Sequence, residues 1–292
     1  MNLIDQASVE KKLSGRMTKN KVFKALFLIC TLIGLVVLTI LIVDILRKGL
    51  PLMSTDFFSN FSSSSASTAG VKGALIGTLW LMMTLIPISL VLGVGSAIYL
   101  EEYAKDNAFT KFVKINISNL ASVPSIVYGL LGATIFVGLL KLGNSVIAAA
   151  LTLALLILPV IIVASQEAIR AVPNSVKEAS YGLGANKWQT IKNVVLPAAI
   201  PGIVTGVILA ISRAIGETAP LVAIGIPTIL LRTPNSILDP FQTLPLQIYD
   251  WARKPGLDFQ ALSSAAIIVL LLILLILNTI AVLIRNKFSK KY

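Results

Sequence analysis

The sequence predicts an all-α integral membrane protein with about six transmembrane helices. Of its 292 residues, 56% are hydrophobic and only 13% are charged, which is too few charges to cover a globular surface. Apolar windows long enough to cross a bilayer core of ~30 Å recur along the chain. The basic residues between these windows gather on alternate loops, as expected when successive helices cross a membrane.

Each apolar window defines one expected span, because crossing takes about 20 apolar residues in a helix. The first window is long for a signal peptide and no small-residue cleavage motif follows it closely, so a retained helix is expected. Residues 1–24 and 285–292 then form basic cytoplasmic tails around a transmembrane domain of residues 25–284. The expected spans are Ala25–Val43, Gly73–Leu100, Ile115–Leu140, Leu142–Gln166, a fifth that begins at Val194, and Ala261–Ile284.

The basic residues orient these spans. Of the 25 Lys and Arg, 17 lie in the two tails and in loops 101–114 and 167–193, and seven lie in the opposite loops. Cytoplasmic loops retain Lys and Arg, so both termini and the loop at about 167–197 are expected to be cytoplasmic. The net charge of +12 is therefore concentrated in the cytoplasmic tails and loops. This asymmetry is typical of a protein in membrane lipid, so the positive charge does not indicate a nucleic-acid partner.

Several kinds of chemistry are excluded by what the sequence lacks. It has no histidine, which removes histidine general bases, catalytic triads and most zinc sites. Its single cysteine, Cys30, lies within the first span and allows neither an intrachain disulfide nor a metal cluster. No Walker-type phosphate-binding motif is present. The chain is therefore expected to be no enzyme and to bind no metal or cofactor of its own.

A polar, basic segment of twenty residues, Glu178–Pro197, joins the fourth span to the fifth and reads EASYGLGANKWQTIKNVVLP. It resembles the EAA loop of MetI-like permeases of ABC importers, with two departures: Ser180 replaces the usual alanine and Val194 the usual isoleucine. The resemblance implies docking on a separate ATP-hydrolysing subunit, which would bind ATP and magnesium. Glycine permits a turn that other residues resist, so two short helices broken near Gly182–Gly184 are expected. The residues that the resemblance assigns to coupling are Glu178, Ala179, Gly184, Leu196 and Pro197.

The third span is unusually polar where it begins, and it contains Ser122, Pro124 and Ser125. Small and hydroxylated residues in lipid serve close helix packing, and the carbonyl that a proline frees needs protein or water to satisfy it. This helix is therefore expected to face the protein interior. Two interpretations stay open: simple helix packing, or a contribution of Ser122 and Ser125 to a substrate pathway.

Arg213 and Glu217 are charged residues inside the fifth apolar segment. Such charges cost about 2.5–3.5 kcal/mol each on an insertion scale and usually face a cavity or a partner. Their spacing of four places both on one helix face, and Arg213 lies about 24 Å beyond Pro197 along a helix, in the outer half of the span. The pair either locks two helical turns together or recognises an anion. Gly216 and Pro220 allow the helix to bend or end there, and Ala219–Leu231 is expected to be a short re-entrant or gating segment.

The anion interpretation fits phosphate better than sulfate. A guanidinium offers a planar fork of donors to an oxyanion. Near neutral pH phosphate still carries a proton, so it can donate a hydrogen bond to the Glu217 carboxylate. Sulfate has no proton to donate and is repelled by that carboxylate. The expected pathway residues are Arg213, Glu217, Thr218, Ser122 and Ser125.

Three segments in the same order, VPSIVYGL, the Glu178 loop and RAIGETAPL, resemble the permease of the bacterial phosphate-specific ABC importer. The resemblance extends from about Gly73 to the C-terminus, and the Ala219–Pro220 pair favours its PstA branch. It implies a multi-pass protein of the bacterial inner membrane, with Arg213 and Glu217 essential for transport. The implied partners are a second homologous permease chain, a cytoplasmic ATPase dimer and an extracytoplasmic phosphate-binding protein.

Two other functions remain open at this point. A permease for another oxyanion, such as sulfate or molybdate, would share the docking loop and differ around the charged pair. An ion-coupled secondary carrier would need no ATPase, and it would show inverted repeats with paired broken helices. No such repeat is visible in the sequence.

Overall fold

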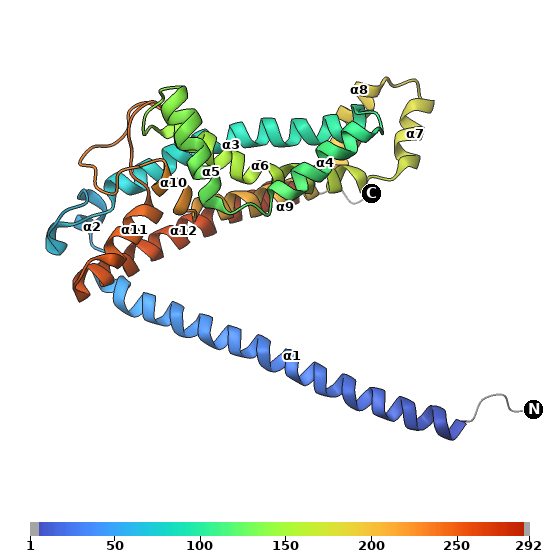
Figure 1. Cartoon of the computed structure of the whole chain (residues 1–292), viewed down its shortest axis with the longest axis horizontal. Coiled ribbons are helices and arrows are strands. Elements are labelled where there is room, and N and C mark those ends of the chain that lie inside the picture. The colour runs from blue at the N-terminus through green and yellow to red at the C-terminus, as the bar shows by residue number, and fades with distance from the viewer. Residues whose placement is uncertain (1–5, 289–292) are drawn as a thin grey trace, which may run out of the picture.

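The computed structural model describes residues 6–288, and every regular element in this range is helical. Figure 1 shows a long bundle with α7 and α8 at one end, called the coupling end here, and α2 and α11 at the other, called the outer end. The α-helices are α1 (Gln6–Gly49), α2 (Thr55–Ser59), α3 (Lys72–Ile98), α4 (Ala108–Leu120), α5 (Ser125–Gly132), α6 (Val146–Arg170), α7 (Asn174–Gly182), α8 (Lys187–Thr190), α9 (Leu196–Ile215), α10 (Ala219–Ala223), α11 (Leu244–Arg253) and α12 (Leu257–Phe288).

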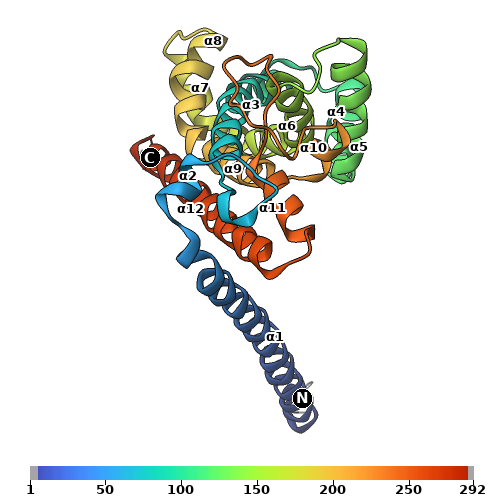
Figure 2. The ribbon, with the colours of Figure 1, turned by 90° about the vertical axis from the view of Figure 1, so that its left-hand side faces the viewer.

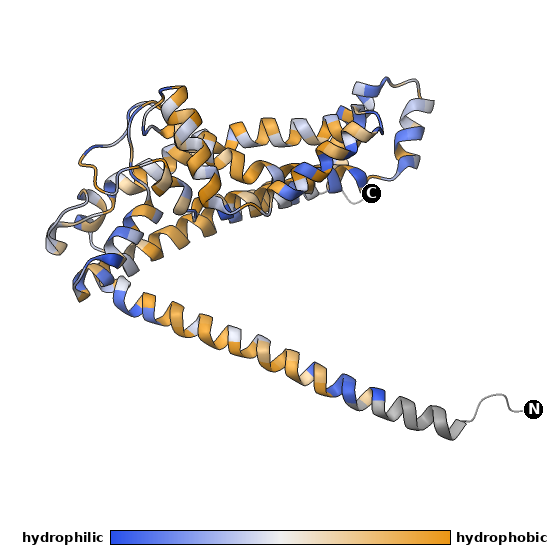
Figure 3. Cartoon of the chain, in the orientation of Figure 1, coloured by the Kyte–Doolittle hydropathy of each residue, from blue (hydrophilic) through white to orange (hydrophobic). Residues whose placement is uncertain are grey.

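The described residues include five helical stretches long and apolar enough to cross a membrane, and a sixth crossing if one bent pair is counted. They contain α1, α3, α6, α9 and α12. Hydrophobic residues run along these helices, and hydrophilic residues gather at the two ends of the bundle (Figure 3). The expected all-helical membrane fold with about six spans is confirmed.

Helix α6 is the centre of the bundle and packs against α3 on one side and α9 on the other. Its backbone approaches that of α9 closely because small residues meet there. A Cβ added at Gly206 would lie 2.3 Å from the Cβ of Ala164, and one at Gly202 would lie 2.7 Å from that of Ala168. Small residues bring membrane helices together in this way, so α3, α6 and α9 form a tightly packed core.

Helix α1 leaves the bundle and contacts it at the outer end alone (Figures 1 and 2). There Gly49 lies against α12, where an added Cβ would meet the backbone nitrogen of Ala265 at 2.7 Å. No residue of its most apolar stretch is buried. The helix continues without a break across the expected boundary between residues 24 and 25, while residues 1–5 of the expected tail lie outside the described range.

The third expected span, Ile115–Leu140, is not one straight helix. It consists of α4 and of α5 with its π-helical extension Ala133–Leu139, and the two parts meet at 105°. Pro124 explains the break, because proline disfavours helical geometry in the residue before it and starts a new helix well. The expected third span is therefore present as a bent pair of helices and not as one straight helix. The bend lies at residues 121–124, between α4 and α5, and is called the elbow here.

Both ends of the described chain lie toward the coupling end. The beginning of α1 and the end of α12 are on the same side as α7 and α8 (Figure 1). Helix α12 extends to Phe288 and so includes the first residues of the expected basic tail; residues 289–292 lie outside the described range. This arrangement agrees with a cytoplasmic location of both termini, as the basic residues predict.

Candidate functional site

Arg213 and Glu217 form an ion pair at the outer end of α9. Arg213 Nε donates to Glu217 Oε1 at 3.3 Å. The Arg213 side chain is 45% exposed and that of Glu217 is 17% exposed in the isolated chain. A guanidinium with one nitrogen engaged keeps other donors free for an anion. The pair therefore has the geometry of a site that is partly satisfied and still open to a ligand.

The helical face that was expected to carry both charges is incomplete. Helix α9 ends at Ile215 with Gly216 as its cap, so Glu217 lies beyond the helix and reaches back to Arg213 across its end. Helix α10 then begins at Ala219, with Pro220 in its first turn, where proline is well tolerated. Arg213 sits in the last turn of α9, where the helix dipole stabilises a positive charge.

The charged pair and the elbow of the third span lie next to each other, although about ninety residues separate them in sequence. Helix α10 packs on α5. A Cβ added at Gly129 would lie 2.7 Å from both Pro220 Cα and Ala223 Cβ. The segments VPSIVYGL and RAIGETAPL are thus in contact in the folded chain.

Tyr128 connects α5 to the end of α4 across the elbow. Its side chain is buried, and its hydroxyl donates to the backbone oxygen of Leu120, the last residue of α4, at 2.8 Å. A carbonyl at a helix end lacks an intrahelical partner, and this bond supplies one. The sequence placed Tyr128 in a notable segment without giving it a role, because a contact with a residue eight positions earlier becomes possible only when the chain folds back.

The remaining expected pathway residues border the site. Thr218 caps the start of α10, and Ser125 is the first residue of α5, both half-buried. Ser122 is exposed in the turn between α4 and α5. Within residues 6–288, no side-chain hydrogen bond joins any of the three to the ion pair. Ser122 and Ser125 thus lie at the elbow, and Thr218 lies at the start of α10.

The close approach of α5 and α10 predicts a steep response to added volume. Gly129→Ala is expected to destabilise the assembled protein by about 1–3 kcal/mol, as overpacking typically does, because its new methyl group meets backbone atoms of Pro220. Thermal unfolding in detergent measures this effect. Gly95→Ala is the matched control, since nothing lies within 4 Å of its added Cβ. Equal unfolding temperatures for the two variants would contradict the described packing.

The segment after α10 is held against the outer end. Asn144 donates to the carbonyl of Gly225 at 2.7 Å, and Ser145 pairs with Pro240 in an isolated bridge. Gln247 donates to the carbonyl of Gly70 at 3.0 Å. The expected re-entrant segment Ala219–Leu231 is helical only over α10 and irregular beyond it. The first two of these contacts hold the irregular segment of residues 224–240 against the start of α6.

The polar loop between α6 and α9, called the coupling loop here, forms two short helices, α7 and α8, as expected. Gly184, with φ +85°, lies in the turn between them, a backbone conformation that residues with a side chain rarely adopt. Glu178 and Ala179 are exposed on α7. Leu196 and Pro197 lie apart from them, half-buried in the first turn of α9. The five residues assigned to coupling are therefore divided between the loop and the base of a span.

Residues 89–291 match the family described as binding-protein-dependent transport system inner membrane component. The chain belongs to this family. It is a multi-pass inner membrane protein, and its resemblance to the permeases of importers is confirmed by relatives that match most of its length.

Two relatives illustrate the similarity in sequence. Phosphate transport system permease protein PstA of Haemophilus influenzae is 33% identical over 277 residues, which cover 95% of this chain and 94% of the relative. The probable ABC transporter permease protein YqgI of Bacillus subtilis is 35% identical over 247 residues, which cover 81% of this chain and 84% of the relative.

Solved structures show the same fold. The bacterial alginate ABC transporter, in complex with an alginate pentasaccharide-bound periplasmic protein, matches with a TM-score of 0.70 over 96% of this chain and 99% of the other at 13% identity. The inward-facing MetNI methionine ABC transporter matches with a TM-score of 0.61 over 75% of this chain and 96% of the other at 16% identity. At these identities the likeness concerns the fold alone, and it confirms the MetI-like prediction.

Two exposed apolar residues of the coupling loop were not predicted from the sequence. Leu183 is 91% exposed, and Trp188 is 55% exposed. Both side chains are exposed in the isolated chain, on the loop that the sequence predicts to dock on an ATPase. Their presence between the charged residues of the loop is a signal that the sequence already contained. No group of three or more His, Cys, Asp or Glu residues in the described chain is placed to hold a metal ion.

Proposed function

We propose that this permease is the transmembrane subunit of an ABC importer that moves inorganic phosphate into the cytoplasm. The observation that carries the proposal is the Arg213–Glu217 ion pair at the end of α9, whose Arg213 side chain is 45% exposed and which is followed by α10, packed on α5. The PstA relatives, which are permease proteins of phosphate transport systems, support it. The chemistry of the pair supplies the physical reason.

The pair suits an anion that carries a proton. Arg213 offers charge-assisted hydrogen bonds to phosphate oxygens. Glu217 accepts a hydrogen bond from the protonated oxygen of phosphate and repels an anion that has no proton, such as sulfate. The ion pair also keeps Arg213 from holding phosphate tightly, which favours release, since a pathway that binds tightly conducts slowly.

ATP hydrolysis supplies the energy in this proposal, and the coupling loop transmits it. A separate cytoplasmic ATPase dimer, which binds ATP and magnesium, docks on Glu178, Ala179, Gly184 and the exposed Leu183, and its closure moves the spans that the loop connects. The permease itself has no ATPase site. The other partners are a second homologous permease chain and an extracytoplasmic phosphate-binding protein. The solved alginate transporter, which carries a periplasmic protein, supports an arrangement of this kind.

Competition between anions tests the substrate. Uptake of labelled phosphate is measured in vesicles that contain the assembled importer, with a hundredfold excess of unlabelled sulfate, molybdate or arsenate. Arsenate, which has the shape of phosphate and also carries a proton near neutral pH, is expected to abolish uptake, and sulfate and molybdate are expected to leave it unchanged. Sulfate or molybdate that abolishes uptake would assign the permease to another oxyanion.

A further inference from the structure

A group of ion pairs at the coupling end of α3 lies outside the candidate pathway. Glu101 and Glu102 occupy the π-helical turn Tyr99–Tyr103 that extends α3. Their side chains are 12% and 8% exposed. We call these two residues the acidic bridge. Carboxylates that are largely buried need hydrogen-bond donors, and the donors here come from three other helices.

Glu101 joins α4 to α6. One of its carboxylate oxygens accepts hydrogen bonds from Lys114 Nζ at 2.8 Å, from Arg170 Nη2 at 2.9 Å and from Gln166 Nε2 at 3.1 Å. Lys114 belongs to α4, the first arm of the broken span, whereas Gln166 and Arg170 lie in the last turns of α6. Three helices therefore meet at a single oxygen atom, and movement of any of them changes these bonds.

Glu102 joins the same turn to the coupling loop. It accepts a hydrogen bond from Lys177 Nζ at 2.7 Å, and the Lys177 side chain is 17% exposed. Lys177 lies in α7, next to Glu178, which the EAA resemblance assigns to docking. Exposed ion pairs contribute little, but loss of one partner from a covered pair leaves a charge without compensation. The Glu102–Lys177 pair therefore ties α7 to α3.

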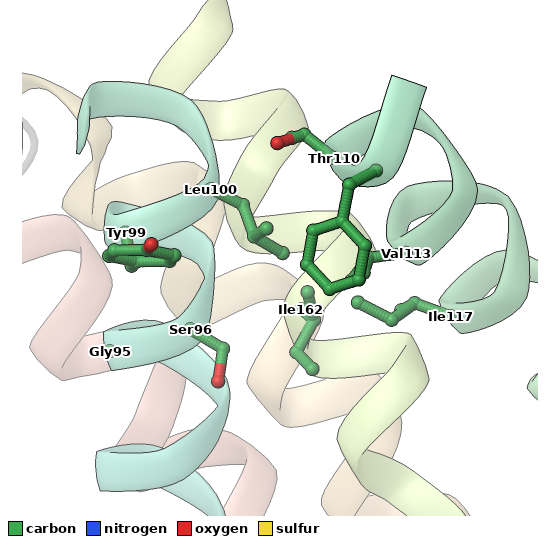
Figure 4. A pocket seen from close by; sticks show the side chains of 9 residues that line it. Gly95, Ser96, Tyr99, Leu100, Thr110, Val113, Ile117 and Ile162 are labelled. Atoms are coloured by element: carbon green, nitrogen blue, oxygen red, sulfur yellow. The ribbon is translucent and has the colours of Figure 1, made fainter. Parts of the chain in front are cut away.

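A cavity borders helix α4 at this end. It has a volume of about 470 Å³ and lies between α4, α3 and α6 (Figure 4). Tyr99 and Leu100 approach the cavity from α3, and Thr110 and Val113 approach it from α4. Thr110 is the one buried residue of α4. The Lys114–Glu101 pair links α4 to the extension of α3, two of the elements that border this cavity.

The other end of α4 leads to the charged pair. Its last carbonyl, at Leu120, accepts the hydrogen bond of Tyr128. The next residue, Gly129, lies against Pro220 of α10, which follows Glu217 by three residues. A displacement of α4 therefore acts on the elbow, on α10 and on the segment that positions Glu217.

We propose that the acidic bridge transmits the movement of α7 to the substrate pathway. In this mechanism Glu102 follows α7 through Lys177, Glu101 passes the displacement to α4 through Lys114, and the elbow passes it to α10. Glu101 and Glu102 are positioning residues of coupled transport and contact neither ATP nor phosphate. The inference rests on the proposed function, since movement of α7 requires an ATPase at the coupling loop.

The first test compares two sets of variants in the assembled importer. Glu101→Gln and Glu102→Gln are combined, and Glu167→Gln is the control, since Glu167 also pairs with Arg170 but is 65% exposed. The number of phosphate ions moved per ATP hydrolysed is expected to fall about fivefold in the double variant and to stay unchanged in the control. An unchanged ratio in the double variant, or a fall that matches loss of the co-purifying ATPase, would overturn the proposal.

A charge swap tests the Glu102–Lys177 pair separately. Lys177→Glu alone is expected to lower the number of phosphate ions moved per ATP, and the further change Glu102→Lys is expected to restore it.

The second test does not depend on the transported ion. Spin labels at Tyr99→Cys and Phe109→Cys, with Cys30→Ser as background, report the distance across the cavity in the complete complex. ATP is expected to change this distance when the bridge is intact and to leave it fixed in the double variant. A change that is absent with the intact bridge, or that persists in the double variant, refutes the proposal. An ATP-driven change without any phosphate uptake would reject the proposed substrate and retain the bridge.

Discussion

Arg213→Gln is expected to slow phosphate uptake by about 10- to 100-fold. A hydrogen bond to a charged group contributes about 1.5–3 kcal/mol, and each 1.4 kcal/mol corresponds to a factor of ten. Glutamine lacks the charge and the planar fork of donors, and it leaves Glu217 without its partner. Arg213→Lys keeps the charge without the fork and is expected to give an intermediate rate. Glu217→Gln is expected to slow uptake as well, because the acceptor for the phosphate proton becomes neutral.

Initial rates of labelled phosphate uptake, at equal amounts of protein in the membrane, measure these effects. Arg47→Gln is the matched control, because Arg47 is an exposed residue at the outer end of α1, far along the chain from the pair. Its rate is expected to equal that of the wild type. A wild-type rate for Arg213→Gln or Glu217→Gln would show that the pair only locks the end of α9 and does not handle the substrate.

Gly184→Asp is expected to abolish ATP-coupled transport while the protein still inserts into the membrane. A Cβ at the observed φ of +85° introduces some backbone strain, which aspartate and asparagine tolerate better than other residues. Aspartate also places a negative charge next to Leu183, the most exposed apolar residue of the loop. Both effects fall on the surface that the ATPase is proposed to contact, and the spans are not touched.

Two further variants separate the causes. Gly184→Asn tolerates the left-handed backbone and adds no charge, so it is expected to retain most of the uptake. Gly182→Ala changes a glycine with ordinary φ and open surroundings, and it is expected to match the wild type. ATP-dependent uptake and co-purification of the ATPase are the measurements. Unchanged transport in Gly184→Asp would remove the loop from the coupling mechanism.

The parts of the fold that hydrophobicity controls could be predicted from the sequence. Long apolar windows have one stable arrangement in a bilayer, which is why α3, α6, α9 and α12 occur where they were expected. The break of the loop near Gly184 was also predictable, since glycine is the residue for that backbone conformation. The elbow was not, because Pro124 indicates a break in the helix without indicating the direction of the next one.

Long-range contacts account for most of what the sequence left out. Nothing in the order of residues indicates that Gly129 meets Pro220, or that Tyr128 reaches back to Leu120. The acidic bridge was missed for the same reason: Glu101 and Lys114 belong to separate elements that meet only in the folded bundle. Arg213 and Glu217 were found because a charge inside an apolar segment stands out without any knowledge of its neighbours.

Uptake of labelled phosphate into vesicles, with and without ATP and under excess unlabelled sulfate, tests the central claim most directly. The vesicles hold the permease with its co-purifying subunits and the external binding protein. We expect phosphate to accumulate only when ATP is present and at a rate that sulfate leaves unchanged. Uptake that proceeds without ATP would contradict the coupling role of the Glu178 loop, and uptake abolished by sulfate would contradict phosphate as the substrate.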